Sequence, residues 1–116
     1  MEATTEETGQ GQISIESFME MDLRVGKILS CELVPKSRKL LIMRIDLGME
    51  VRQILAGLAP FYLPEEMVGR RVVVVANLKP AKLMGKESQG MILAAGEMPP
   101  ALVAVPEGVP VGARVR

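Results

Sequence analysis

Short patterns typical of β-strands recur along this 116-residue chain, and only one helical pattern interrupts them. In the segment 41–47, apolar residues recur at every second position, with Arg44 and Asp46 between the later ones, which indicates a strand with one buried face. The segment 72–78 begins instead with four successive valines, which is typical of a strand buried on both faces. The sequence predicts further strands at 24–34, 51–56 and 88–95, with a loop at 79–87, and therefore an all-β domain.

The helical pattern covers residues 60–68. Pro64 is followed by Glu65 and Glu66, which favour the first turn of a helix, and Gly69 is a stop signal. The resulting order of three strands, a helix and two strands is that of the OB-fold. We therefore predict a five-stranded OB-fold barrel with a short helix between strands 3 and 4 and a C-terminal extension.

The two ends of the chain differ from the predicted barrel. Residues 1–14 are polar and acidic, and we expect a flexible tail or linker, whereas 15–116 forms one domain. In the segment 17–22 a serine precedes Phe18, and a helical turn there is expected to cover the barrel. The extension at 101–115 is apolar but interrupted by prolines, so we expect it to dock on the barrel and on a second copy, giving a symmetric homodimer.

The composition excludes several kinds of catalytic site. There is no histidine and only one cysteine, Cys31, which rules out a His-based nucleophile, a zinc site of the usual kind and a disulfide framework. Gly85-Lys86 does not form a phosphate loop, because Pro80 replaces its first glycine and Glu87 its Ser or Thr. We predict no catalytic residue, metal or cofactor, and interpret Cys31 as a buried structural thiol.

The charge distribution is asymmetric although the net charge is zero. Residues 1–22 carry six acids and no base, so the remaining 94 residues have a net charge of +6. Such a basic body is expected to meet phosphate, and a solvated surface is the alternative. No apolar run exceeds five residues, so we expect no membrane span or signal peptide and a cytoplasmic location.

Two basic segments adjoin the predicted strands at the positions where OB barrels bind oligonucleotides. Aromatic residues are few, which argues against binding by base stacking and favours phosphate contacts with a structured RNA. Met84 or Met91 could hold a base, although a methionine more often fills a core. The basic residues are Lys36, Arg38 and Lys39 in the first segment and Lys79, Lys82 and Lys86 in the second.

Four sequence segments resemble the tRNA-binding OB-domain family in order and spacing. They are DLRVGKI at 22–28, KL at 39–40, VVVANLKP at 73–80 and SQGM at 88–91. The family includes the C-terminal domain of bacterial methionyl-tRNA synthetase, a free-standing bacterial tRNA-binding protein and the endothelial monocyte-activating polypeptide. The resemblance covers residues 15–116.

The resemblance implies a non-catalytic domain that binds tRNA with low selectivity, aids aminoacylation and dimerises through its C-terminal extension. The family's binding segments match this chain at Lys39, Asn77, Lys79, Lys82, Ser88 and Met91. The segment 36–38 departs from the family, in which a small residue and Asp usually precede the Lys-Leu pair. We still expect the segment 36–38 to bind tRNA, but not through the contact that the family's Asp would make.

The overall resemblance is to the methionyl-tRNA synthetase domain, which would place a synthetase catalytic domain upstream. A free-standing tRNA-binding protein would have nearly the same sequence, so both readings remain open. A CsaA-type export chaperone, which binds unfolded polypeptide on the same fold, is the alternative from another class. Its relatives lack the Asn-Leu-Lys-Pro segment.

Overall fold

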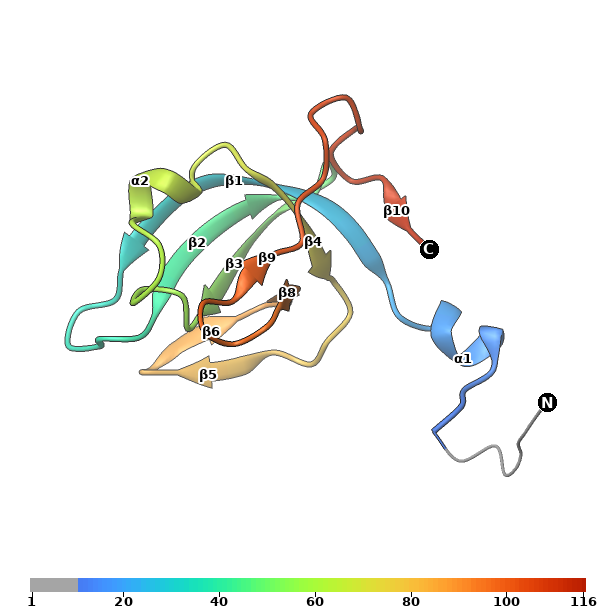
Figure 1. Ribbon diagram of the computed structural model, residues 1–116, viewed down its shortest axis with the longest axis horizontal. Coiled ribbons are helices and arrows are strands. Elements are labelled where there is room, and N and C mark those ends of the chain that lie inside the picture. The colour runs from blue at the N-terminus through green and yellow to red at the C-terminus, as the bar shows by residue number, and fades with distance from the viewer. Residues whose placement is uncertain (1–10) are drawn as a thin grey trace.

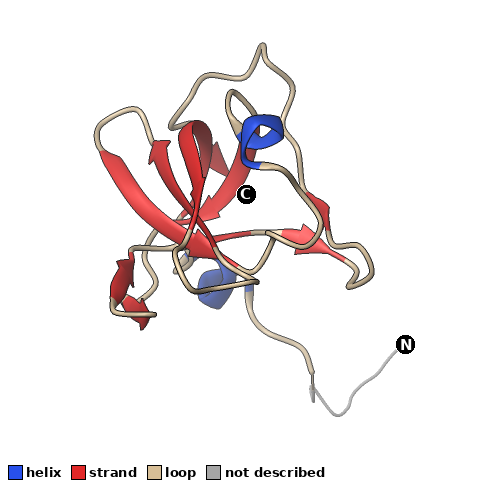
Figure 2. Ribbon diagram, turned by 90° about the vertical axis from the view of Figure 1, so that its left-hand side faces the viewer, coloured by secondary structure: helices blue, strands red, loops and turns tan. Residues whose placement is uncertain are grey.

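The computed structural model describes residues 11–116, so most of the predicted flexible tail at 1–14 lies outside the described residues. The main sheet is antiparallel and curves into a nearly closed OB-fold barrel, with strand order β3-β2-β1-β4-β7 (Figures 1 and 2). The five-stranded barrel predicted from the sequence is confirmed. The strands are β1 (Leu23–Leu33), β2 (Leu41–Asp46), β3 (Val51–Ala56), β4 (Arg71–Val75) and β7 (Met91–Ile92).

The alternating pattern of β2 places its apolar residues inside the barrel, where Leu41, Met43 and Ile45 are fully buried. β1 is long enough to pair with both β2 and β4, and an irregularity between Ile28 and Ser30 interrupts its register with β2. Gly26 of β1 lies in close packing, because a Cβ atom there would come within 2.6 Å of the Ile45 side chain. The inner face of β1 therefore requires glycine at this point.

The short helix α2 (Pro64–Met67) lies between β3 and β4, as predicted, although it is shorter than the predicted 60–68. Pro64 occupies the first turn, and the Glu66 carboxylate accepts a hydrogen bond of 2.8 Å from the Leu63 N–H. Met67 is fully buried in the main core. The helix thereby closes one end of the barrel.

A second helix, α1 (Ile15–Met19), precedes β1. Its N-cap is Ser14, whose side chain accepts a hydrogen bond of 3.0 Å from the Ser17 N–H, so the helix begins earlier than the sequence predicted. Phe18 packs against a small cluster formed by Leu23, Val73 and Val75 on the outer side of the sheet. The predicted covering of the barrel by this segment is confirmed.

The segment 79–87, predicted as a loop, contains a hairpin formed by β5 (Ala81–Leu83) and β6 (Lys86–Ser88). Met84 and Gly85 form its two-residue turn, and both have positive φ angles, 53° and 78°. This turn geometry is usually signalled by Asn-Gly or Asp-Gly. The prediction was wrong because Met-Gly gives no comparable signal.

Two predicted strands are also shorter than expected. The strand predicted at 72–78 ends at Val75, and the one predicted at 88–95 is divided among β6, β7 and β8 (Ala94–Ala95), with the first break at Gly90. Gly90 has a φ of +141°, and a Cβ atom there would come within 2.9 Å of the Val75 carbonyl oxygen. This close approach explains the break, since the chain can turn there only at a glycine.

The C-terminal extension docks on its own barrel, as predicted. Its short strand β10 (Arg114–Val115) pairs with β1, and β9 (Ala101–Leu102) pairs with β8 (Ala94–Ala95). Gly112 donates a hydrogen bond of 2.7 Å to the Val25 carbonyl and adopts a φ of +89°. The second part of the prediction, contact with another copy, stays a prediction. Within residues 11–116, no helix is long and apolar enough to cross a membrane.

Candidate nucleic-acid interface

The outer face of β1, β2 and β3 carries a polar row across the barrel. Ser30 of β1 lies opposite Arg44 of β2, which lies opposite Gln53 of β3. Residues directly opposite one another in antiparallel strands share a face, so these three side chains line up. With Glu32 and Ile42 they line a shallow groove of about 170 Å³.

The turn between β1 and β2 presents the first predicted basic group. Lys36, Arg38 and Lys39 are all exposed, and Lys36 has a positive φ of 68°. The hydroxyl of Ser37 accepts hydrogen bonds from the N–H groups of Lys39 and Leu40, at 3.2 and 3.1 Å. The turn is therefore ordered by its own serine, and its cations project from a fixed backbone.

The β5–β6 hairpin presents the second basic group. Lys82 of β5 lies opposite Glu87, whereas Lys86 of β6 lies opposite Leu83. Because side chains alternate along a strand, Lys82 and Lys86 lie on opposite faces of the hairpin. Lys86 shares its face with Ser88, whose side chain contacts β3. The two lysines, grouped in the sequence, therefore point in different directions.

The β1–β2 turn and the tip of the β5–β6 hairpin lie at the same end of the molecule in Figure 1. Gln53 connects the hairpin to the polar row, because its side chain donates a hydrogen bond of 2.8 Å to the Glu87 carbonyl. Lys79 precedes β5 at the opposite end of the hairpin, in a hollow of about 510 Å³ shared with Arg52 and Asn77. The β1–β2 turn and the hairpin with Lys82 and Lys86 thus border one polar face, whereas Lys79 lies away from it.

Two of the predicted site residues already use their side chains within the fold. Ser88 is 5% exposed, and its hydroxyl accepts a hydrogen bond from the Leu55 N–H at 3.0 Å and donates one to the Gly90 carbonyl at 3.1 Å. The Asn77 amide accepts a hydrogen bond from the Asp22 N–H at 2.9 Å and donates one to the Glu20 carbonyl at 2.7 Å. Both residues hold distant segments together.

Met91 lies on another wall of the barrel. It is 46% exposed and stands opposite Val75 on the outer side of β4 and β7. Val75 belongs to the cluster that Phe18 covers. The structure therefore separates Met91 from the β3-facing side of Ser88, although only two residues lie between them in the chain.

Arg44 and Gln53, which occupy the centre of the polar face, were not among the predicted site residues. The alternation in the segment 41–47 was the available signal, because it predicts that Arg44 points away from the core. Nothing comparable marks Gln53, since its strand has no regular alternation. Its position depends on pairing with β2.

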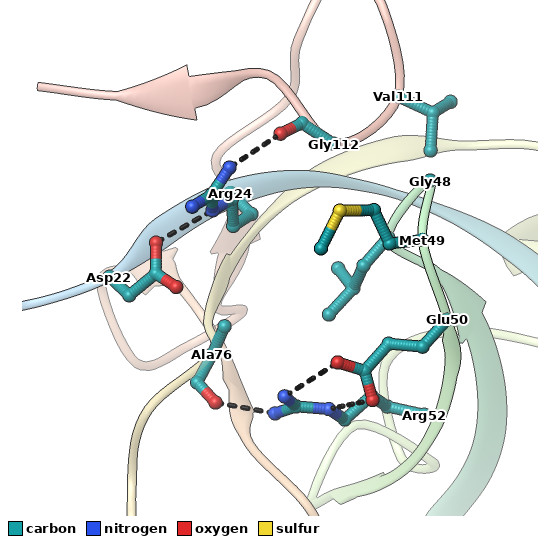
Figure 3. Close-up of a pocket in the computed structure, with 10 residues that line it drawn as sticks. Asp22, Arg24, Gly48, Met49, Glu50, Arg52, Ala76, Val111 and Gly112 are labelled. Atoms are coloured by element: carbon teal, nitrogen blue, oxygen red, sulfur yellow. Dashed lines mark hydrogen bonds and ion pairs between the residues drawn. The ribbon is translucent and has the colours of Figure 1, made fainter.

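A separate pocket of about 340 Å³ lies at the other end of β2 and β3, beside the C-terminal extension (Figure 3). The Arg24 guanidinium pairs with Asp22 at 2.7 Å and donates a hydrogen bond of 3.2 Å to the Gly112 carbonyl. Asp22 and Arg24 therefore help to hold the extension against β1.

Arg52 forms the other ion pair of this pocket. Its guanidinium makes two hydrogen bonds with the Glu50 carboxylate, at 3.0 and 3.1 Å, and also contacts the Ala76 carbonyl. The hydrogen bonds and charge of Arg52 lower the pKa of Glu50, and those of Glu50 raise the pKa of Arg52. The pocket's charges are thus paired, which makes it a poor site for phosphate.

The described residues contain neither a metal-ligand cluster nor an activated cysteine. Between residues 11 and 116, no cluster of three or more His, Cys, Asp or Glu side chains could hold a metal ion. Burial, with a smaller contribution from the Glu32 charge, raises the pKa of Cys31 to about 11. The thiol therefore stays protonated near neutral pH, which agrees with its interpretation as a structural residue.

Comparison with known families gives a match over most of the chain. Residues 23–114 match a family model described as "Putative tRNA binding domain". The chain is 64% identical over 86 residues to the methionine–tRNA ligase of Thermotoga maritima. That alignment covers 74% of this chain but only 14% of the ligase, so the chain spans a small part of this curated relative.

Two solved structures share the fold over nearly their full length. A MetRS-related protein from Pyrococcus horikoshii superposes with a TM-score of 0.84 at 38% identity, covering 90% of this chain and 97% of that one. The chaperone CsaA from Bacillus anthracis str. Ames gives a TM-score of 0.81 at 25% identity, covering 90% and 99%. The resemblance predicted from the sequence motifs is confirmed.

Proposed function

Because the chain belongs to the tRNA-binding domain family, we propose that it is a non-catalytic module that binds structured tRNA with low sequence selectivity. The observation that carries this proposal is the placement of the basic β1–β2 turn and the basic β5–β6 hairpin beside one polar face. Phosphate contacts position a nucleic acid without reading its sequence, so such a surface binds many tRNAs in a similar way. The net charge of +6 on residues 23–116 adds long-range attraction.

The contacts that we propose come mainly from cations. Lys36, Arg38 and Lys39 bind phosphates from the β1–β2 turn, and Lys79, Lys82 and Lys86 bind them from the second basic segment. Arg44 extends the positive surface between the two groups. Met84, 55% exposed at the hairpin tip, is placed to pack against one base.

We further propose that this module serves aminoacylation as the C-terminal domain of a methionyl-tRNA synthetase or as a free-standing tRNA-binding protein in the cytoplasm. Its similarity to part of a methionine–tRNA ligase and to 97% of the solved chain of a MetRS-related protein supports both forms. As part of a synthetase, the domain would raise the local concentration of tRNA near the linked catalytic site. Homodimerisation through the C-terminal extension would place two such surfaces in one particle.

The test is tRNA binding by the full chain, measured as a function of salt concentration. If about four to six phosphates are neutralised, log affinity falls with log salt at a slope of roughly −3 to −5. The triple variant Lys79→Ala, Lys82→Ala, Lys86→Ala is expected to bind more weakly and with a shallower slope. A flat salt dependence, or unchanged binding by the triple variant, would contradict the proposal.

A chaperone that holds unfolded polypeptide is the second candidate, because the chain shares its fold with a CsaA chaperone. Two exposed apolar residues favour the chaperone: Met91 of β7 and Val103, which follows β9. The same preparation can be tested for suppressing aggregation of a reduced client protein. Protection of the client together with salt-independent tRNA binding would favour the chaperone over the tRNA-binding module.

A further inference from the structure

Three further cations gather where α2 ends and β4 begins, outside the two basic segments described above. Arg71 is the first residue of β4 and stands directly opposite Lys27 of β1. The two side chains therefore share the outer face of the sheet. Arg70 immediately precedes Arg71, and the next residue along β4, Val72, already points into the core.

A groove of about 460 Å³ runs between residues 68–72 and the segment 102–107 of the C-terminal extension. The backbone joins its two sides, because the Val105 N–H donates a hydrogen bond of 3.0 Å to the Arg71 carbonyl. Figure 1 shows the extension running beside β4 in this region. The charged residues lining the groove are Arg70, Arg71 and Glu107, so the two arginines leave an excess of positive charge.

Arg71 lacks the partners that a half-buried arginine normally has. The ion pairs among the described residues join Arg24 to Asp22 and Arg52 to Glu50, and neither involves Arg71. Its Nε is buried without a hydrogen-bond partner, and in residues 11–116 no other buried side-chain nitrogen or oxygen is left in this state. Burying part of a guanidinium in this way costs stability. The fold does not neutralise this cation.

Arg70 is held in place without being neutralised. Its Nε donates a hydrogen bond of 2.8 Å to the Glu66 carbonyl, and its guanidinium lies 5.5 Å from the centre of the Tyr62 ring. Tyr62 is itself fixed, because its hydroxyl donates a hydrogen bond of 2.9 Å to the Pro100 carbonyl. A positioned guanidinium loses little freedom when it binds an anion.

We propose that this groove is a second phosphate-binding site, in which Arg71 and Arg70 contact the RNA backbone beyond the polar face of β1, β2 and β3. A guanidinium donates paired hydrogen bonds that match the geometry of a phosphate. Lys27 adds a third positive charge beside Arg71, and on its other side it stands opposite Asp46 of β2. The proposal rests on the proposed tRNA-binding function and adds a contact that the basic segments do not supply.

The test compares two variants that each remove one positive charge. Arg71→Gln is expected to weaken the binding of unfractionated tRNA about fivefold at low salt and to reduce the salt slope by about 0.7 to 0.9. Arg116→Gln removes the same charge at the exposed C-terminus, far from α2 in Figure 1, and is expected to change affinity less than about twofold. Glu107→Gln removes the carboxylate from the groove and is expected to strengthen binding about twofold or more.

Equal affinities for Arg71→Gln and Arg116→Gln would overturn the second site. The proposed function would stand in that case if the Lys79, Lys82 and Lys86 triple variant still lost binding. Weaker binding by Arg71→Gln accompanied by a changed circular dichroism spectrum or oligomeric state, with no gain from Glu107→Gln, would also overturn the site. The site would also be overturned if Arg71→Gln lost binding to poly-glutamate but kept its binding to tRNA. The groove would then bind an acidic polypeptide.

Discussion

At the scale of single residues, Ser88 and Asn77 join segments that are distant in the chain. Ser88 binds the backbone of Leu55, 33 residues away, and Asn77 binds the backbone of Asp22, 55 residues away. In each case a polar side chain replaces a backbone partner that a regular strand would have supplied. Both side chains therefore have a structural role, and their contact with tRNA stays a prediction.

Replacing Ser88 with alanine is expected to destabilise the fold. Ser88→Ala leaves the buried Leu55 N–H without a partner, which should lower the free energy of unfolding by about 1–3 kcal/mol. Ser30→Ala, the same change on the outer face, is expected to stay within about 0.5 kcal/mol. Thermal unfolding measures both. If Ser88→Ala instead unfolds like the parent and binds tRNA more weakly, its hydroxyl contacts the ligand.

Cys31 is expected to make stability depend on pH in the alkaline range. Its pKa is about 11 in the folded state, against 9.0 as the ordinary value. The unfolded chain therefore loses this proton first as the pH rises, and the stabilisation is present below pH 9 and lost toward pH 11. Urea unfolding between these pH values should show a loss on the order of 1 kcal/mol that Cys31→Ala lacks. Parallel pH profiles for the parent and the variant would refute this explanation.

At the scale of elements, the β5–β6 hairpin determines how the second basic segment meets a ligand. The register pairs Lys82 with Glu87, so that lysine has a carboxylate beside it on its own face. Lys86 instead shares the face of Ser88, which contacts β3 and so borders the polar groove. The hairpin thus places two lysines that are alike in the sequence in two different environments.

The two lysines are therefore expected to differ in their contributions. Lys86→Ala should weaken tRNA binding by about 1 kcal/mol, roughly fivefold, because it removes a phosphate contact beside the face. Lys82→Ala should have less than half this effect. Filter binding at one fixed salt concentration gives the comparison. Equal losses would indicate that the hairpin contributes only its overall charge.

The elements that the sequence predicted well are those with a strong local pattern. The alternation at 41–47, the valines at 72–75 and the Pro64-Glu65-Glu66 start signal each depend on neighbouring residues, and the barrel order followed from them. The hairpin, the divided strand at Gly90 and the polar row through Gln53 depend on contacts between distant segments. The basic groups could be located from the sequence, but their directions could not, because side-chain direction follows strand register.

At the scale of the whole molecule, one wall of the barrel remains apolar at its surface. Phe18 and the extension residues Val105 and Val115 cover the cluster of Leu23, Val73 and Val75. Beyond this cover, further apolar side chains remain exposed. These are Ile15 (66%), Met21 (41%), Met91 (46%) and Val103 (40%). An apolar surface assembled from both ends of the chain is suited to a symmetric contact with a second copy.

The extension cannot simply be deleted to test dimerisation. Its strand β10 pairs with β1, and Gly112 and Ala113 form hydrogen bonds with Val25, so a truncation after Pro100 would also remove part of the barrel's own packing. A monomeric truncated chain would therefore be explained by local unfolding as readily as by a lost interface. Point changes at exposed positions avoid this problem, because they leave the backbone pairing intact.

We predict a homodimer in solution that Val103→Glu converts to a monomer. Val103 is 40% exposed, so the charge is tolerated in an isolated chain, but it would be buried without a partner in an apolar interface. Val51→Glu is the matched control, since Val51 is 42% exposed on β3, a strand outside this wall. Light scattering gives the mass, and circular dichroism checks that both variants fold.

Because two basic surfaces in one particle strengthen binding to a single polyanion, the monomeric variant should also bind tRNA at least tenfold more weakly. A parent chain that is monomeric, or a Val103→Glu variant that remains dimeric, would show that the extension serves only its own barrel.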